Sequence, residues 1–432
     1  MDFRCIGLID KRQYKIGAAS ACLVALIIFS VFSAYVLCIP TEAFLETRNQ
    51  ALIRALVRGQ KSDGAYPPFS RLFPGNESCL PCTAEVITIC DQLGSLNLIN
   101  TGAAIEYILA NQNQTTGSFS NHGSQELYTN WLCVNALIIT NSIDRCNSTS
   151  LELLILNHYN ETSGAFYEPD GSCSFDMWRG EPYPFDKDNM ISTHLGISIL
   201  KSMDSLDIIN TSKTLSWVYQ SKGPDGGFRP FPNATDNSGG FFSGAYGTGL
   251  PYTYCALMIL EDLDQIAGYI EMHSNDTIDF VWGCQTFLGD FHIITNSDPH
   301  SGAANDPPHD WETFYAIRAL DVLGGLDESE EGLILTLDTT LDRQLLDYQY
   351  RIYLPDFLAR CPHYGLFGGE EYDIGGTYGA VNILSLTGTL EILDSFTPRS
   401  IAAISTVIFI LVFAIILGSL VLLAYRHGHP EA

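Results

Sequence analysis

A short signal, a glycine followed two residues later by an aromatic side chain, recurs along this chain and constrains its fold more than any other feature. The glycines are Gly64, Gly117, Gly164, Gly289 and Gly365, and a doubled form stands in the stretch S-K-G-P-D-G-G-F-R-P-F at 221–231. Most copies follow a run with helical spacing of apolar residues. Glycine suits the left-handed conformation that ends a helix. The signal therefore predicts a recurring turn at the end of a helix, with the aromatic ring buried beneath it.

A second signal, a threonine that opens an apolar run, follows each turn. The threonines are Thr83, Thr129, Thr193, Thr253, Thr313 and Thr377, and from Thr129 on they are spaced by 64, 60, 60 and 64 residues. Runs such as T-Y-C-A-L-M-I-L and T-F-Y-A-I-R-A-L carry apolar residues at helical spacing. The two signals together predict an internal repeat of six units, each with a helix, a turn, a loop and a second helix, over about residues 45 to 395.

Two apolar segments flank the repeat, at residues 16–39 and 401–424. Each is long enough to cross a bilayer of ~30 Å as a helix. Basic residues before the first segment favour a cytoplasmic N-terminus. The sequence therefore predicts a cytoplasmic N-terminus at 1–15, a transmembrane helix at 16–39, an extracytoplasmic domain at 42–398, a second transmembrane helix at 401–424 and a cytoplasmic tail at 425–432. The expected location is the cell membrane, with the bulk of the chain outside.

Possible glycosylation sites and cysteines agree with this topology. Sequences of the type N-x-S/T lie only between the two segments, at Asn76, Asn113, Asn147, Asn160, Asn210, Asn233 and Asn275. Chance in an Asn-rich chain would supply a few of them. Nine cysteines lie in the same part of the chain, where disulfides are expected. Cys79-Leu-Pro-Cys82 resembles a redox or metal half-site, but without a second C-x-x-C a structural disulfide is favoured.

The charge of the chain narrows its possible partners. The formal net charge is -27 at pH 7, and no basic patch interleaved with aromatic residues is present. Such a surface repels the phosphates of nucleic acids. We therefore expect no nucleic-acid partner.

The repeat resembles the α/α toroid of the protein prenyltransferase β subunits and of the terpene and squalene cyclases. The resemblance is carried best by the stretch from Gln220 through Gly227-Phe228 to Thr253-Tyr254. It implies an all-α fold, an α6/α6 toroid, which is a closed barrel of six helical hairpins with a cavity at the ends of its inner helices. With the flanking segments, the expected architecture is this toroid flanked by two transmembrane helices.

The resemblance also implies a zinc site, and this chain departs from it. Aligned on the repeat threonine, the three ligand positions of the prenyltransferases fall on His309, Trp311 and Gly376. Tryptophan and glycine side chains cannot bind zinc. His309, Asp310, Glu312 and Asp373 offer a different metal set, although solvated carboxylates near a helix N-terminus are the favoured interpretation. The prediction is no metal and no cofactor.

The region that supplies the diphosphate pocket in this family lacks cations. A prenyl diphosphate needs Lys, Arg or a metal to neutralise its phosphates and the charge of the leaving group. None of the 88 residues from Pro230 to Ile317 is Lys or Arg, and twelve are Asp or Glu. This argues against prenyl transfer.

Two other enzyme classes are considered. Asp186-Lys-Asp188-Asn189 approximates the D-x-D-D motif of the cyclases but lacks its last Asp, and an acidic loop capping a helix is favoured. Extracellular α/α barrels include glycosidases, which place two carboxylates across a cleft. The candidate catalytic acids are therefore Asp188, Asp310, Glu312 and Asp373, and the candidate ligand-binding residues are His309, Trp311 and Tyr372.

The leading hypothesis is a membrane-anchored, extracytoplasmic toroid that has lost prenyltransferase chemistry. Its partner would be an apolar, isoprenoid-like molecule held in the cavity, or a protein bound at the surface. The alternatives are a divergent prenyltransferase-like or terpene-cyclase-like enzyme and a carbohydrate-active barrel enzyme.

Overall fold

The structure is a computed structural model that describes most of the repeat region. The described residues are 47–67, 77–120, 126–168, 188–234, 247–286, 291–292, 310–326 and 374–395, with scattered residues in 332–340 and 404–419. One compact unit comprises Leu52–Leu345 and Pro362–Ile392, and the other comprises Met1–Ala51, Leu346–Cys361 and Leu393–Ala432.

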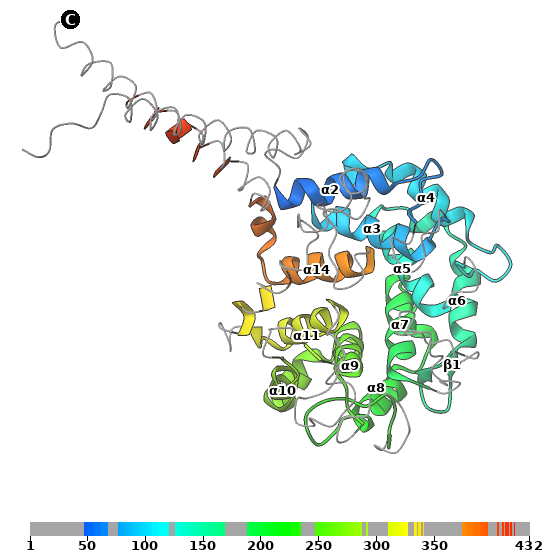
Figure 1. The fold of residues 1–432 in the computed structure, drawn as a ribbon. Coiled ribbons are helices and arrows are strands. Elements are labelled where there is room, and N and C mark those ends of the chain that lie inside the picture. Colours follow the sequence, from blue (N-terminus) through cyan, green and yellow to red (C-terminus); the bar gives the residue numbers. More distant parts are fainter. Residues whose placement is uncertain are drawn as a thin grey trace, which may run out of the picture. The chain divides into compact units, whose positions relative to one another are not determined.

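Six helices form the inner layer of an α/α toroid (Figure 1). Each packs against the next in chain order, and the last packs against the first. Their apolar residues are buried almost all round, as expected of helices enclosed by others. They are α3 (Leu80–Gln92), α5 (Glu126–Ile139), α7 (Met190–Ser202), α9 (Leu250–Asp262), α11 (Asp310–Leu323) and α14 (Ile374–Leu386).

Outer helices alternate with the inner ones along the chain and bury one face each. They are α2 (Arg48–Gly59), α4 (Thr101–Ala110), α6 (Ser148–Asn157), α8 (Thr211–Gln220) and α10 (Ile266–Gly283). The short 3-10 helices are η2 (Leu96–Leu98), η3 (Ile143–Arg145), η4 (Leu206–Ile208) and η8 (Leu390–Asp394). Two short strands, β1 (Tyr159–Asn160) and β2 (Ala165–Phe166), pair antiparallel. The sixth outer helix falls largely outside the described residues, so the full six-hairpin barrel stays a prediction.

Asparagine side chains start three of the outer helices. Asn100, Asn147 and Asn210 are the N-caps of α4, α6 and α8, and each Oδ1 accepts a hydrogen bond from the backbone N–H three residues on. This satisfies one of the donors left unpaired in the first turn of a helix. These three outer helices therefore begin where the sequence supplies an Asn.

Four of the described turns are joined to their inner helices through the hydroxyl of the repeat threonine. The backbone N–H of Phe228 donates to Thr253 Oγ1 at 3.0 Å, and Thr253 Oγ1 donates to the carbonyl of Gly249 at 2.9 Å. The same donation joins Tyr66 to Thr83, Phe166 to Thr193 and Phe291 to Thr313. In the second repeat the N–H of Phe119 instead donates to Asn130 Oδ1 at 2.8 Å. The two recurring sequence signals are thus the two ends of one hydrogen bond.

The doubled glycine at 226–227 reflects two separate close approaches. Gly226 has φ +93°, and a Cβ there would collide with the backbone carbonyl of Asp276 on α10. A Cβ on Gly227 would lie 2.7 Å from the ring of Phe280. The first glycines of the other described turns, Gly64, Gly117 and Gly164, also have positive φ and pack against the backbone of the next outer helix. Glycine therefore allows each of these turns to pack closely against the next outer helix.

Glutamine side chains link each of the first two turns to the following outer helix. Gln112 Nε2 donates to the carbonyl of Gly117 at 3.0 Å, while its Oε1 accepts from the N–H of Asn147 at 2.8 Å. Gln60 makes the equivalent bonds to Gly64 and Asn100. These bonds explain why Gln60 and Gln112 stand between a helix and its turn.

The expected burial of the turn aromatics is confirmed where the structure describes them. Phe228 and Phe291 have 0% of their surface exposed. Phe367 lies outside the described residues. The rings are therefore part of the core beneath the turns, as the sequence predicts.

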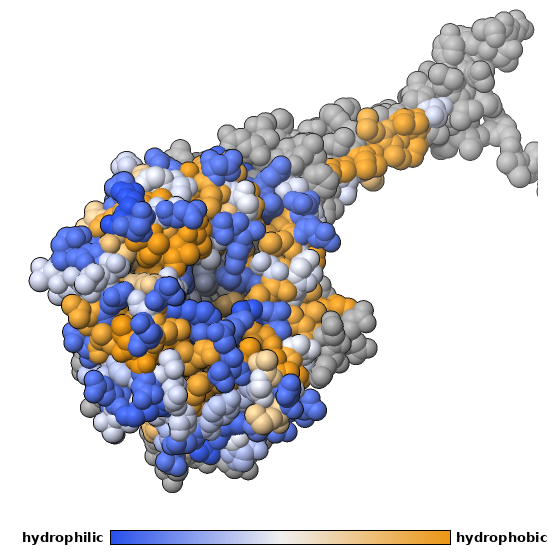
Figure 2. Space-filling model, turned by 180° about the vertical axis from the view of Figure 1, so that it is seen from behind, coloured by the Kyte–Doolittle hydropathy of each residue, from blue (hydrophilic) through white to orange (hydrophobic). Residues whose placement is uncertain are grey.

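The predicted membrane segments are described only in part. Residues 16–39 lie outside the described residues. Within the residues that the structure does describe, no helix combines the length and apolar character needed to span a bilayer. The described part of 401–424 carries exposed large apolar side chains (Figure 2), namely Ile408, Phe409, Leu411, Val412, Ile415 and Ile416.

Replacing Thr83 with valine tests the threonine bridge. Thr83 Oγ1 accepts from the N–H of Tyr66 and donates to the carbonyl of Cys79. The valine leaves a buried N–H without its partner, so we expect a loss of about 1 to 3 kcal/mol in the free energy of unfolding. Thr88→Val on the same helix is the control, because Thr88 bonds only to the carbonyl of Ala84. Equal losses for the two variants in denaturant titrations would contradict this role.

Candidate functional site

Aromatic side chains from five of the six inner helices meet inside the ring. They lie within two residues of the repeat threonines in sequence and form a central aromatic cluster of Tyr128, Trp131, His194, Tyr254, Trp311, Phe314, Tyr315 and Tyr378. His194 meets Tyr254 edge to face with 5.5 Å between ring centroids, and Tyr254 stacks on Tyr315 at 4.8 Å. The cluster runs without a break from α5 to α14.

The rings face the centre of the toroid. Burial is the main cause that raises the pKa of Tyr315 well above its usual value, and the nearby Tyr128 contributes next. These two tyrosines stand on α11 and α5, which are not neighbours in the ring. Ring contacts between neighbouring inner helices agree with this arrangement, since Trp131 of α5 meets His194 of α7 and Tyr254 of α9 stacks on Tyr315 of α11. Figure 2 shows the back face of the molecule hollowed near its middle.

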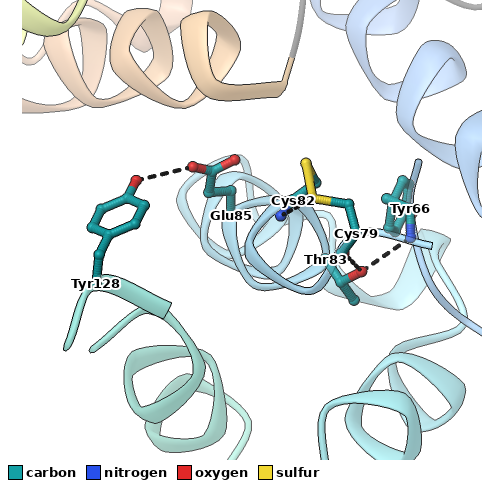
Figure 3. The surroundings of a disulfide bond; sticks show 6 residues. All are labelled: Tyr66, Cys79, Cys82, Thr83, Glu85 and Tyr128. Atoms are coloured by element: carbon teal, nitrogen blue, oxygen red, sulfur yellow. Dashed lines mark hydrogen bonds between the residues drawn. A yellow bond between two sulfur atoms is a disulfide. The ribbon is translucent and has the colours of Figure 1, made fainter. Parts of the chain in front are cut away.

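One carboxylate, Glu85 of α3, lies beside this cluster. Its side chain is 5% exposed and its Oε1 accepts a hydrogen bond from the hydroxyl of Tyr128 at 3.2 Å (Figure 3). Burial first, and then the charge of Glu85, raise the pKa of Tyr128 well above its usual value. Glu85 was not among the predicted site residues, although its position two after Thr83 matches that of Trp131 after Thr129.

A buried neutral histidine sits within the cluster. Desolvation lowers the pKa of His194 to about 4, so the imidazole is uncharged at neutral pH. Its Nδ1 is buried and has no hydrogen-bond partner among the described residues. The cluster therefore contains a polar atom but no positive charge at this position.

The cation nearest in sequence to the cluster is already neutralised. Arg318 of α11 forms ion pairs with Glu261 at 2.9 Å and with Asp321 at 2.6 Å. Each contact is short enough to hold the guanidinium away from another anion. The described part of the lumen thus offers ring faces and a carboxylate rather than a site for a phosphate.

The residues at the family's zinc positions do not fit a metal. Trp311 is half-buried and its ring lies 5.3 Å from that of Tyr378 and 6.0 Å from that of Tyr315, so it fills space within the cluster. Gly376 lies in α14 and has no side chain to offer. No group of three or more possible metal-ligating side chains occurs among the described residues.

The predicted site residues are only partly brought together. Trp311 joins the central aromatic cluster, and Glu312 follows it on α11, half-buried. Asp310 is the first residue of α11, and its side chain is not described. His309, Tyr372 and Asp373 lie outside the described residues. The pair of carboxylates needed by the carbohydrate-active alternative therefore stays a prediction.

Asp188 lies in a separate pocket. Both of its carboxylate oxygens accept hydrogen bonds from Asn160 Nδ2, at 3.1 and 3.0 Å. The next residue, Asn189, is the N-cap of α7 and accepts from the N–H of Ser192 at 2.8 Å. The helix cap thus accounts for the Asn of the D-x-D-N sequence. None of the residues lining this pocket belongs to the central aromatic cluster.

The predicted glycosylation sites differ in their surroundings. Asn147 and Asn210 are explained structurally as helix caps, and Asn160 is bonded to Asp188. Asn76 lies outside the described residues. Four sites are exposed, namely Asn113, Asn210, Asn233 and Asn275.

Most of the cysteines that the structure describes are buried thiols rather than disulfides. Cys79 and Cys82 are bonded to each other at the start of α3, which agrees with the predicted disulfide. The described cysteines outside a disulfide are Cys90, Cys133, Cys146, Cys255 and Cys284. Burial raises the pKa of each one for which a shift is resolved, including Cys90 to about 12. These thiols are therefore unreactive packing residues.

A family model, the prenyltransferase α/α toroid domain, matches the chain in three overlapping stretches, residues 11–167, 129–305 and 292–408. The chain belongs to this family. The repeated matches follow from the internal repeat, since one domain model fits several registers of it. Membership establishes the fold and leaves the activity to the site.

Two relatives give the family match more detail. The geranylgeranyl transferase type-1 β subunit of Arabidopsis thaliana is 27% identical over 216 residues, 46% of this chain and 50% of that protein. The chain thus spans about half the length of this curated relative. A type II terpene cyclase from Scytonema, solved with geranylgeranyl dihydroxybenzoate, superposes with a TM-score of 0.50 at 13% identity over 79% of this chain and 97% of that one. This second likeness shows the toroid fold alone.

The buried imidazole gives a pH-dependent prediction. An unfolded His has a pKa near 6.5, and His194 in the folded state has one of about 4. The unfolded chain binds the proton more readily between these values, so acidification destabilises the fold there. His194→Phe has no proton to bind at this position. We therefore expect its free energy of unfolding, relative to that of the parent protein, to rise by roughly 2 kcal/mol as the pH falls from 6.5 to 5. Chemical denaturation at each pH measures this, and a difference that stays constant with pH would contradict it.

Proposed function

We propose that this protein is a membrane-anchored, extracytoplasmic toroid that binds an apolar, isoprenoid-like ligand in the central aromatic cluster without transferring it. The observation that carries the proposal is the continuous set of rings from Trp131 through Tyr254 to Tyr378. Burying each methylene of such a ligand gains ~0.8 kcal/mol and requires no charged group.

The charges around the cluster support an uncharged ligand. Arg318 is paired with two carboxylates, and the sequence from Pro230 to Ile317 contains no Lys or Arg. A diphosphate brought into this surrounding would lose its hydration without gaining a cation. The curated relative is named for geranylgeranyl transfer, which supports an isoprenoid as the apolar class.

A terpene-cyclase-like enzyme is the second candidate, and Glu85 is the observation that favours it. A buried carboxyl group beside aromatic faces combines a proton donor with groups that stabilise a developing cation. If the protein turns over its ligand, incubation with a polyprenyl alcohol should yield a product that is lost in Glu85→Gln. Unchanged ligand in both proteins supports the binding role.

Calorimetry with matched ligands tests the binding proposal. The full-length chain in detergent micelles should bind geranylgeraniol and should not bind geranylgeranyl diphosphate, with empty micelles as the blank. Tyr254→Leu should weaken alcohol binding by about threefold to tenfold, because an aromatic contact is worth about 0.5 to 1.5 kcal/mol. Tyr219→Leu on α8 is the control, since Tyr219 lies outside the central aromatic cluster.

Two outcomes would overturn the proposal. The first is stoichiometric zinc in the purified protein together with selective binding of the diphosphate. The second is alcohol binding that is equal in the parent protein and Tyr254→Leu, because it would place the ligand elsewhere.

The location is proposed on separate grounds. The exposed apolar side chains from Ile408 to Ile416 match the predicted second membrane segment. We expect protease added to intact cells to cleave within residues 42–398 and to spare both termini. Glycosidase should remove sugar from Asn113, Asn233 or Asn275, which are exposed. A protected middle segment without glycans would contradict the extracytoplasmic location.

A further inference from the structure

An open pocket of about 600 Å³ lies where the third and fourth repeats meet. Its aromatic walls are Tyr159, Tyr167, Trp217 and Phe231. Its polar residues are Asn160, Glu161 and Asp188. The volume is in the range of pockets that hold small organic ligands. Nothing in the proposed isoprenoid binding uses these residues.

The hydroxyl and amide donors of this pocket are already engaged within the protein. Tyr159 Oη donates to the carbonyl of Asn210 at 3.4 Å and accepts from its N–H at 3.1 Å. Tyr167 Oη donates to the carbonyl of Asn157 at 3.2 Å. Asn160 Nδ2 donates to both oxygens of Asp188. The ligand therefore meets acceptor oxygens and ring faces.

The charge of the lining is negative. Glu161 is exposed and Asp188 half-buried, and neither Lys nor Arg is among the lining residues that the structure describes. Lys213 lies beside the wall, where its Nζ donates to the backbone oxygen of Glu161 at 2.6 Å, but it does not line the pocket. The whole chain carries a formal charge of -27, which also favours the approach of cations.

We propose that this pocket binds a small organic cation, an alkylammonium group with an apolar part. Aromatic faces attract such a cation through their quadrupoles, and four aromatic side chains line this pocket. The carboxylate of Asp188 supplies the opposite charge. A sugar fits less well, because it needs donors as well as acceptors from its site.

The site also bears on the glycosylation sequence at Asn160. A glycan on Asn160 would occupy the same pocket that the cation needs. Thr162→Ala removes the acceptor sequence and keeps Asn160, whose Oδ1 accepts only from the backbone N–H of residue 162. All binding measurements are therefore made on the full-length chain carrying Thr162→Ala.

Choline and its neutral isostere, in which tert-butyl replaces trimethylammonium, are the probes. We expect calorimetry to detect choline binding and no binding of the isostere. Asp188→Asn should weaken choline binding by at least tenfold, and Glu161→Gln by a smaller factor because that side chain is exposed. Asp207→Asn, on the exposed turn η4 outside the pocket, should leave binding unchanged.

Several results would overturn the inference. They are equal binding of choline and the isostere, unchanged choline binding in Asp188→Asn, and no choline binding by the parent at millimolar concentration. Thermal unfolding verifies that each variant is folded. If Asp188→Asn does not fold, Glu161→Gln tests the role of charge in its place. Because the central aromatic cluster shares no residue with this pocket, the isoprenoid measurements succeed or fail independently.

Discussion

The hydrogen bond from a turn N–H to the hydroxyl of a repeat threonine is the interaction on which the rest of this toroid depends. A buried backbone N–H must find an acceptor, and Thr253 supplies it while returning its own proton to Gly249. The bond fixes the direction in which the chain leaves the turn and enters the inner helix. Glycines such as Gly226 then let the turn sit directly on the next outer helix. The turn thus both orients the inner helix of its own repeat and forms the contact with the next repeat.

Because the inner helices that carry this bond are oriented in the same way, the residues near their threonines converge on the centre of the ring. This is why His194 contacts Tyr254, and Tyr254 contacts Tyr315, although the three are far apart in sequence. Placing a charge in the interior that these residues form costs free energy, in agreement with the lowered pKa of His194. The same interior is favourable for hydrocarbon. The lumen therefore disfavours charged groups and favours apolar ones.

Much of this architecture could be predicted from the sequence, because the repeat signals are local. The described turn glycines and buried aromatics lie where the pattern predicts, whereas each inner helix begins three residues before the threonine that was expected to open it. The central aromatic cluster was largely missed, since an inner helix such as α9 is apolar on all faces and periodicity cannot distinguish inward from outward. Only Trp311 was found, through the family's ligand position. The pocket at Asp188 could not be predicted from the sequence either, because the residues that line it are spread along the chain from Tyr159 to Phe231. For Asn147 and Asn210, a helix cap accounts for a residue that the sequence suggested only as a glycan acceptor.

The glutamine bridges have a consequence for how the domain folds. Gln112 donates a hydrogen bond to the carbonyl of Gly117 in its own turn and accepts one from the backbone N–H of Asn147. The N-cap residue of one repeat's first helix is therefore bonded by a side chain of the repeat before it. Gln60 does the same for Asn100. Separating two such repeats would leave the backbone N–H of Asn147 without its acceptor on one side and Gln112 Oε1 without its donor on the other. Folding should therefore be cooperative across repeat boundaries, and new chain ends in a circular permutant would be tolerated better in an exposed loop within a repeat than at the junction between two.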